Sequence, residues 1–358
     1  MILTRLEIEG FRNLSGVAFD PHPTLNLLNG PNGAGKSSVL EAIQCLSTGH
    51  SFRSRKAREL VSSGKDQLSI VARLRDLGTN RGHRIGLARG RDGTLTMRLD
   101  YEAVDNIAQA TRLLPVKTLS PDSHALVQEG PEERRRFLDW GVFHVEPRFF
   151  DVWRLYRRAL SQRNQALRDQ RSDSEVWSWD EQLIEAGEQV DAYRRAYVGQ
   201  LAEILQARSE NLGTPLGVAL RYRGGWAEGT ALGESLANNR LQHRRMRTTT
   251  DGPHRAELAM TIDAVPVRQL LSRGQQKVLV YLMHLSQLEL MAARSGRQAI
   301  VLCDDLLSEL DGDNVDDVVV QLLELAEQVF VSGVTTVPLE RYDHRRFHVK
   351  QGCLTAVQ

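Results

Sequence analysis

The chain has 358 residues, of which 41% are hydrophobic and 25% are charged. This length and composition are typical of a globular protein with about two lobes, and they exclude a fibrous, low-complexity or disordered chain. The 46 Lys and Arg residues nearly balance the 45 Asp and Glu residues, so bulk charge neither favours nor excludes a nucleic-acid partner.

The cysteines and the N-terminus indicate the compartment. The 3 cysteines lie far apart and form no CxxC pair, which argues against a zinc site or a disulfide framework and favours a reducing compartment. The first ten residues, MILTRLEIEG, lack the apolar core of a secretory signal. No apolar run approaches the roughly 18 residues that a membrane helix requires. We expect a soluble, cytoplasmic protein with no membrane partner.

The first third of the chain is expected to form strands. Leu3, Leu6 and Ile8 alternate with polar residues, and an apolar strand is predicted at Leu25–Asn29. Further strands are predicted, between glycine-containing turns, at Leu68–Leu74, Ile85–Ala88 and Leu95–Leu99.

A phosphate-binding loop follows the strand at Leu25–Asn29. The loop matches the pattern GxxxxGK[ST] and opens a predicted helix at Lys36–Leu46. Its residues are Gly30, Pro31, Asn32, Gly33, Ala34, Gly35, Lys36 and Ser37, followed by Ser38. Backbone N–H groups and the helix N-terminus can bind the phosphates of ATP, while Lys36 reaches the β- and γ-phosphates and Ser37 binds Mg²⁺. The alternative, a glycine-rich turn with a solvated lysine, is disfavoured by the flanking strand and helix.

The middle of the chain is predicted to be helical. From about Pro131, and through Arg134–Gly213, apolar residues recur at helical spacing, which predicts two or three long helices. No heptad repeat is sustained, so no long coiled-coil arm is expected.

The last hundred residues alternate between helix and strand. The predicted elements are a helix at Gln275–Ala293, a strand at Ala299–Cys303, a helix at Asn314–Glu327 and a strand at Gln328–Ser332. Continuous apolar strands separated by helices are typical of a parallel sheet that is covered on both faces.

Two aspartates end the strand at Ala299–Cys303. Asp304 is expected to bind Mg²⁺, and Asp305 to orient or deprotonate the attacking water, so that Lys36 and Asp305 are the catalytic candidates. The alternative is that both aspartates only cap the strand end.

A third segment, Leu271–Lys277, lies at a predicted helix start. Ser272 can cap the helix, and Gly274 permits close approach of an anion. The segment, which contains Ser272, Arg273, Gly274 and Gln275, resembles the LSGGQ signature of ABC-type ATPases. In that class the signature of one subunit closes over the γ-phosphate that its partner holds. Ser308–Asp311 stands where the class has its D-loop.

Basic clusters are the candidate DNA contacts. The favoured cluster contains Arg53, Arg55, Lys56 and Arg58, and others occur at Arg81–Arg91 and His243–Arg247. Charge runs of this kind are, however, more often solvated faces than DNA contacts. The cluster Arg134–Arg136 can instead pair with nearby acidic residues.

The chain also resembles a known family. Leu6–Leu14, the FLDWG stretch at Phe137–Gly141 and the GPHR stretch at Gly252–Arg255, together with the phosphate loop and signature, are similar to the RecF family of SMC-type ATPase heads. The resemblance runs from Met1 to about Leu310. It implies an α/β ABC/SMC-like P-loop ATPase head with an inserted helical lobe: ATPase lobe at 1–130, helical lobe at 131–251 and ATPase lobe again at 252–358.

The resemblance also implies a function. RecF proteins form a homodimer on binding ATP and bind DNA at duplex regions and single-strand/duplex junctions. They hydrolyse ATP slowly, and hydrolysis releases the DNA. With RecO and RecR they help to load RecA during DNA repair and replication. Arg12, in the Phe-Arg-Asn motif, is implied as a nucleotide contact.

The sequence departs from the ABC pattern at two positions, and two alternative protein classes remain open. Asp305 replaces the glutamate that most ABC ATPases carry. The switch histidine expected after Val329–Ser332 is absent, and Thr335 or Thr336 occupies its place. The Mg²⁺-sensing glutamine is not assigned, although Ser120–Asp122 marks its neighbourhood. The alternatives are a transport-linked ABC subunit and another SMC-like repair ATPase.

Overall fold

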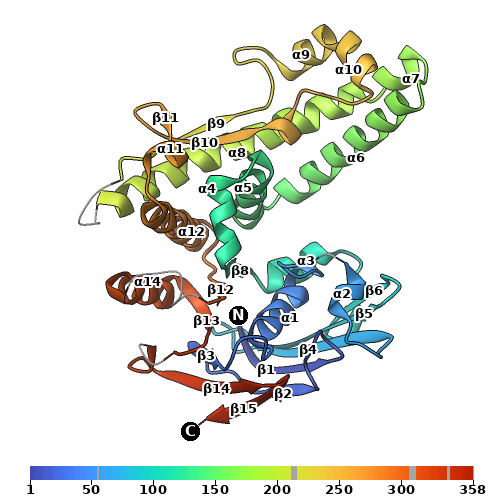
Figure 1. Ribbon diagram of the computed structural model, residues 1–358. Coiled ribbons are helices and arrows are strands. Elements are labelled where there is room, and N and C mark those ends of the chain that lie inside the picture. The colour runs from blue at the N-terminus through green and yellow to red at the C-terminus, as the bar shows by residue number, and fades with distance from the viewer. Residues whose placement is uncertain (55, 211–215, 306–311, 337–338, 358) are drawn as a thin grey trace. The chain divides into compact units, whose positions relative to one another are not determined.

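The computed structural model of the protein describes residues 1–54, 56–210, 216–305, 312–336 and 339–357. The chain divides into two compact units (Figure 1). Each unit has a hydrophobic core of its own. The first unit combines Met1–Ser123 with Gly296–Gln358, and the second is His124–Ser295. This division differs from the expected boundaries after residues 130 and 251. Residues 252–295 belong with the helical unit because α12 (Arg273–Ser295) packs on α8 (Asp180–Glu210).

The described part of the first unit combines two sheets with several helices. Its strands are β1 (Ile2–Glu9), β2 (Val17–Phe19), β3 (Leu25–Asn29), β4 (Gln67–Arg75), β5 (Gly82–Gly90), β6 (Leu95–Leu99), β7 (Glu102–Ala103), β8 (Val116–Leu119), β12 (Ala299–Cys303), β13 (Ala326–Gly333), β14 (His344–Lys350) and β15 (Cys353–Val357). Its helices are α1 (Lys36–Thr48), α2 (Ala57–Leu60), α3 (Ile107–Leu113) and α14 (Gly312–Leu325).

One sheet has the order β15-β14-β3-β13-β12-β8, and all neighbours except β14 and β15 are parallel. The parallel sheet expected from the sequence is therefore confirmed, with β3 and β12 at the predicted residues. The strands β8, β12, β13 and β3 run in one direction, so their carboxyl ends meet at one edge, where ligands bind in α/β sheets.

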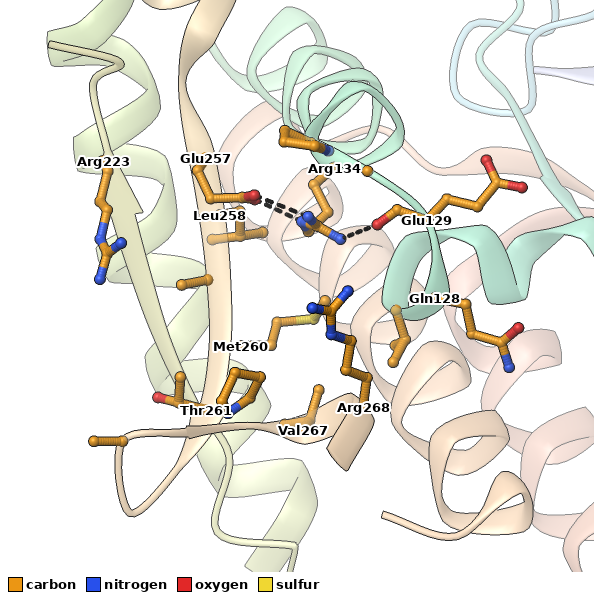
Figure 2. A pocket seen from close by; sticks show the side chains of 16 residues that line it. Gln128, Glu129, Arg134, Arg223, Glu257, Leu258, Met260, Thr261, Val267 and Arg268 are labelled. Atoms are coloured by element: carbon orange, nitrogen blue, oxygen red, sulfur yellow. Dashed lines mark hydrogen bonds and ion pairs between the residues drawn. The ribbon is translucent and has the colours of Figure 1, made fainter. Parts of the chain in front are cut away.

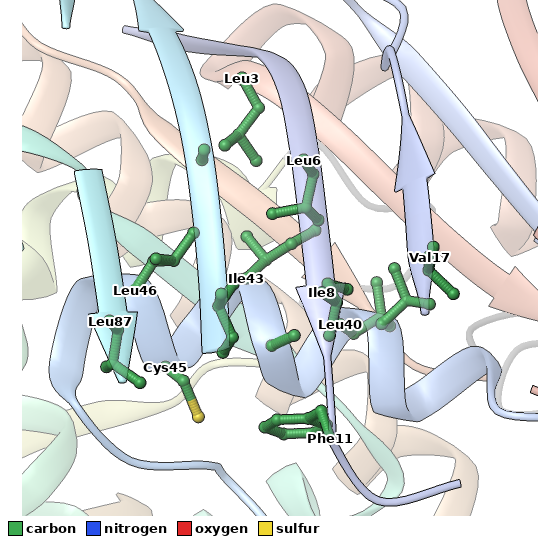
Figure 3. Close-up of a cluster of buried hydrophobic side chains, with 14 of the residues drawn as sticks. Leu3, Leu6, Ile8, Phe11, Val17, Leu40, Ile43, Cys45, Leu46 and Leu87 are labelled. Atoms are coloured by element: carbon green, nitrogen blue, oxygen red, sulfur yellow. The ribbon is translucent and has the colours of Figure 1, made fainter. Parts of the chain in front are cut away.

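The other sheet is antiparallel, in the order β2-β1-β4-β5-β6-β7. In β4 the residues alternate between buried and less buried, as a sheet with one covered face requires. Helix α1 contacts strands of both sheets. Figure 3 shows Leu40, Ile43 and Leu46 of α1 among side chains of β1 and β5 in this core. The packing fixes α1, and with it the loop that precedes it.

The second unit is mainly helical. Its helices are α4 (Ala125–Gln128), α5 (Pro131–Val145), α6 (Phe149–Arg168), α7 (Asp173–Trp177), α8, α9 (Leu232–Asn238), α10 (Arg240–Met246), α11 (Val267–Leu270) and α12, and its strands are β9 (Ala219–Arg223), β10 (Glu257–Ile262) and β11 (Val265–Pro266). The predicted long helices are α5, α6 and α8, and α8 packs on the other two and on α12. The described residues of the unit thus form a bundle without a coiled-coil arm. The small sheet β11-β10-β9 was not predicted.

Candidate nucleotide site

The loop between β3 and α1 has the curled backbone that phosphate binding requires. Gly30, Gly33 and Gly35 have φ values of 155°, 77° and 113°. A Cβ atom on Gly30 would lie 2.1 Å from the carbonyl oxygen of Val349 in β14. Glycine at Gly30 is therefore needed both for its backbone conformation and for the close approach of β14.

The side chain of Lys36 lies along this loop. Its Nζ atom donates to the carbonyl oxygens of Gly30 at 2.9 Å and Pro31 at 3.1 Å, and the residue is buried. Asn13 stabilises the loop through two hydrogen bonds. Its Nδ2 donates to the Gly33 carbonyl at 3.0 Å, and its Oδ1 accepts from Ser38 Oγ at 2.9 Å. The loop is thus held in shape by the chain itself.

Asp304 lies beside the start of α1. Its Oδ1 atom accepts hydrogen bonds from Ser37 Oγ at 2.8 Å and from Ser332 Oγ at 2.7 Å. The Asp304 backbone N–H donates to the carbonyl of Leu119, the last residue of β8. The carboxyl ends of the parallel strands β8, β12 and β13 therefore meet at Asp304.

The structure thus brings together two predicted metal ligands, Ser37 and Asp304, which are distant in the sequence. A serine hydroxyl and a buried carboxylate 2.8 Å apart are hard oxygen donors of the type that Mg²⁺ prefers. The donor set fits Mg²⁺ bound together with phosphate oxygens, and one sheet edge carries both the loop and the carboxylate.

Asp305 follows in a left-handed conformation, with φ of 52°. Its backbone N–H donates to Ser332 Oγ at 3.1 Å, so one serine fixes both aspartates. A non-glycine residue in this region of φ is uncommon, and such outliers cluster at functional sites. Ser120–Asp122 follows β8, which pairs with β12, so this segment lies at the same sheet edge as Asp304.

Arg12, implied as a nucleotide contact, is held by a carboxylate of α1. Its Nε and Nη2 atoms donate to Glu41 Oε2 at 2.9 and 2.6 Å. Glu41 is fully buried and also accepts a hydrogen bond from Ser51. Arg12 therefore lies near the phosphate-loop helix, in a position fixed by a buried charge.

The members of the favoured basic cluster make different contacts in the structure. Arg53 donates to Asp304 Oδ2 at 2.7 Å, so its guanidinium lies beside the candidate metal ligand, although 44% of the side chain is exposed. Lys56 is exposed and pairs with Glu59 at 3.2 Å. Arg58 is exposed and lines a surface hollow with Arg91. Arg55 lies outside the described residues.

The signature segment begins α12 in the second unit. Ser272 Oγ accepts the backbone N–H of Gln275 at 3.3 Å, and Gln275 Oε1 accepts the backbone N–H of Ser272 at 2.9 Å. Ser272 therefore caps the helix as expected, and Gln275 adds the reciprocal bond of a capping box. A Cβ atom on Gly274 would meet no atom within 4 Å, so the helix start is open to a ligand. The expected D-loop, Ser308–Asp311, lies outside the described residues.

The arginines at 134–136 form ion pairs or hydrogen bonds with other residues of the second unit. Arg134 forms a two-pronged ion pair with Glu257, at 2.6 and 2.8 Å, and also donates to the Glu129 carbonyl (Figure 2). These residues line a groove of about 490 Å³. Arg136 pairs with Glu132 and Glu133, as the alternative interpretation of this cluster expected.

Four residues at the site were not foreseen in their observed roles: Asn13, Glu41, Arg53 and Ser332. Ser332 lies near the end of β13, which neighbours β12, so the parallel-sheet prediction contained a signal for it. Arg53 carried no such signal, because its partner lies far along the sequence.

These features define a class of protein: a P-loop ATPase head of the ABC/SMC type, with the phosphate-loop motif after β3 and the candidate metal-ligating aspartate after β12. The family description "RecF/RecN/SMC N terminal domain" matches residues 2–353. The "DNA replication and repair protein RecF" of Thioalkalivibrio sulfidiphilus is 43% identical over 357 residues, which cover 99% of each chain. That of Shewanella baltica is 37% identical over 363 residues, covering 100% of each chain. The chain belongs to the RecF family.

Solved structures show the same fold. The recombination mediator protein RecF with ATPrS, in the RecFOR pathway, superimposes with a TM-score of 0.89 at 23% identity and covers 100% of this chain and 98% of its own. An Smc head bound to the C-terminal winged-helix domain of ScpA gives a TM-score of 0.57 at 15% identity, with 100% of this chain and 97% of that chain covered. Among the helices that the structure describes, none combines the length and apolar character needed to cross a bilayer.

Proposed function

We propose that the protein binds ATP and Mg²⁺ at the β3–α1 loop and hydrolyses ATP slowly. The observation that carries this proposal is the 2.8 Å contact between Ser37 and Asp304 beside a glycine loop whose backbone is curled for phosphate. Mg²⁺ would neutralise charge on the phosphate oxygens. Lys36 binds the β- and γ-phosphates, Ser37 and Asp304 hold the metal, and Asp305 orients the attacking water.

The signature supports an ATP-dependent homodimer. In this proposal the capped start of α12 in one copy, residues 272–275, closes over the γ-phosphate that the partner's loop holds. Its helix N-terminus favours an anion, and its Gly274 leaves room for one. ATP binding thus assembles the dimer, and hydrolysis dissociates it.

The dimer is proposed to clamp DNA, at duplex regions next to single strands, in recombinational repair and replication restart. The support is membership of the RecF family, whose members are named as DNA replication and repair proteins, and the RecFOR pathway named for the solved relative. RecO and RecR are the proposed partners in loading RecA. The exposed Lys56 and Arg58, with Arg55, are the proposed phosphate contacts, so DNA affinity should fall with salt.

The dimer can be tested with Lys36→Arg. The bulkier guanidinium should displace the γ-phosphate from its place in the loop, because Lys36 is buried against the Gly30 and Pro31 carbonyls. Sedimentation with ATP and duplex DNA should then show dimers for the wild type and monomers for the variant. Dimer formation by the variant at wild-type ATP concentrations would contradict the proposal.

Asp305→Asn tests the catalytic assignment. The amide cannot accept a proton, so hydrolysis should fall by at least about a hundredfold while ATP and DNA binding persist. The variant dimer should therefore remain on DNA longer than the wild-type dimer. Equal dissociation rates, measured by chasing labelled DNA from the two complexes, would remove Asp305 from this role.

A further inference from the structure

The contact between Arg53 and Asp304 suggests a role that no motif assigns. Arg53 Nη2 lies 2.7 Å from Asp304 Oδ2, while Asp304 Oδ1 accepts from Ser37 and Ser332. The Asp304 side chain is 0% exposed and that of Arg53 is 44% exposed. A buried carboxylate that serves as a metal ligand is therefore already paired with a cation from the chain.

Arg53 is placed by the fold. Its backbone N–H donates to Ser51 Oγ at 2.9 Å, and Ser51 donates to Glu41, which is buried on α1. The neighbouring Phe52 packs against the core of the first unit. The guanidinium therefore extends toward Asp304 from a turn that is anchored on the phosphate-loop helix.

Two cations compete for one carboxylate in this arrangement. The ion pair leaves Asp304 with little net charge to attract a divalent ion, and the positive guanidinium repels such an ion. A bound triphosphate adds negative charge, which attracts both the metal ion and the guanidinium. This charge replaces the attraction that Asp304 cannot supply while it is paired with Arg53. Metal binding and nucleotide binding should therefore be coupled.

We propose that Arg53 is a positioning residue that holds Asp304 and keeps free divalent ions off it, so that the metal binds strongly only together with a triphosphate. This inference rests on the ATP and Mg²⁺ site proposed above. It concerns the order and coupling of binding at that site, and it does not depend on DNA or on dimer formation.

The test is a titration of the full-length protein with Mn²⁺, followed by electron paramagnetic resonance, without nucleotide. In Arg53→Gln the freed carboxylate should bind Mn²⁺ roughly five- to tenfold more tightly than in the wild type, a range limited by the partial exposure of the pair. Arg53→Ala should shift in the same direction, so the test does not depend on one variant. Arg53→Lys, which keeps the charge, should stay close to the wild type.

Arg98→Gln is the matched control, because it removes one positive charge from an exposed residue of β6 that lies outside every basic cluster named above. Its Mn²⁺ affinity should equal that of the wild type. Repeating the titration with ATP should show less coupling between metal and nucleotide in Arg53→Gln. Unchanged Mn²⁺ affinity in both Arg53→Gln and Arg53→Ala, or an equal increase in Arg98→Gln, would overturn the proposal. A tightened Mn²⁺ site in a protein that fails to bind DNA would leave it standing and count only against the clamp.

Discussion

Single atoms decide the shape of the phosphate loop. Gly30 approaches β14 so closely that a methyl group would lie 2.1 Å from the Val349 carbonyl oxygen, and φ at this position is 155°. Backbone cannot move aside as a flexible side chain can. The loop's glycine pattern thus reflects packing against the sheet as well as phosphate binding.

Gly30→Ala should destabilise the protein by more than about 2 kcal/mol and abolish ATP binding, because both the clash and the backbone conformation are unfavourable. Denaturant unfolding and ATP titration measure the two effects. Gly130→Ala is the control, since no atom lies within 4 Å of its added Cβ and φ is −73°. Its effect should stay within about 0.5 kcal/mol. Wild-type stability for Gly30→Ala would show that β14 moves away freely.

His254, in the GPHR stretch, is held in its neutral form. Its Nε2 atom bonds the Thr249 carbonyl at 3.0 Å, which leaves Nδ1 to accept from the Tyr156 hydroxyl at 2.6 Å. Burial lowers its pKa from 6.5 to about 4, with further lowering by nearby arginines such as Arg255 and Arg135. The folded protein therefore resists protonation that the unfolded chain accepts.

Stability should respond to pH accordingly. Above pH 6.5 His254 is neutral in both states and contributes no pH dependence. As the pH falls from about 6.5 to about 4, the unfolded state gains the proton first, so the free energy of unfolding decreases by up to about 3 kcal/mol. His254→Gln should show a shallower decrease between pH 7 and pH 5 in denaturant unfolding followed by circular dichroism. Identical slopes would exclude His254 as the source.

At the scale of elements, the second unit depends on a close meeting of α5, α8 and α12. Gly141 of α5 faces Tyr197 of α8 and Gln287 of α12. An added Cβ atom would lie 2.1 Å from the Tyr197 hydroxyl oxygen and 2.7 Å from Gln287 Nε2. The glycine of the FLDWG stretch therefore has a packing role.

Gly141→Ala should destabilise the second unit by about 2–3 kcal/mol, as overpacking does in cores. Tyr197→Leu removes both of the nearest atoms, the hydroxyl oxygen and Cζ at 2.3 Å, so the double variant should recover part of the loss, and the two changes should not be additive. A double-mutant cycle of thermal unfolding measures the coupling. Strict additivity of the two changes in free energy of unfolding would mean that α5 and α8 move apart at no energetic cost.

The sequence predicts β3, β12 and β13 of the parallel sheet and β1, β4, β5 and β6 of the antiparallel sheet, but it misses β8, β14 and β15. Continuous apolar strands such as Leu25–Asn29 and Ala299–Cys303 are recognisable because both faces are buried, and the motifs after them located Ser37 and Asp304. The small sheet β11-β10-β9 was missed because its strands are short and partly exposed. The pairing of Arg53 with Asp304 joins positions 251 residues apart, which no local pattern reports.

At the scale of the whole molecule, the two units have separate cores, and the loop and Asp304 both lie in the first. A ligand that binds there stabilises the first unit directly. It acts on the second only through coupling between the units.

ATP with Mg²⁺ should raise the midpoint of thermal unfolding. At a ligand concentration of 100 times the Kd, the added stability is about 2.7 kcal/mol. Calorimetry with and without nucleotide measures the shift, and Lys36→Ala should abolish it. A shift that persists in Lys36→Ala would place the nucleotide elsewhere.

The hairpin of β14 and β15 has a consequence for biosynthesis. Gly352, at its turn, donates to the Ala34 carbonyl at 2.9 Å, and β14 lies against Gly30, so residues near position 350 complete a loop near position 30. During synthesis, the contacts of this loop cannot be completed until more than three hundred further residues have been translated. A nascent chain would thus complete its nucleotide loop only after the β14–β15 hairpin has been synthesised.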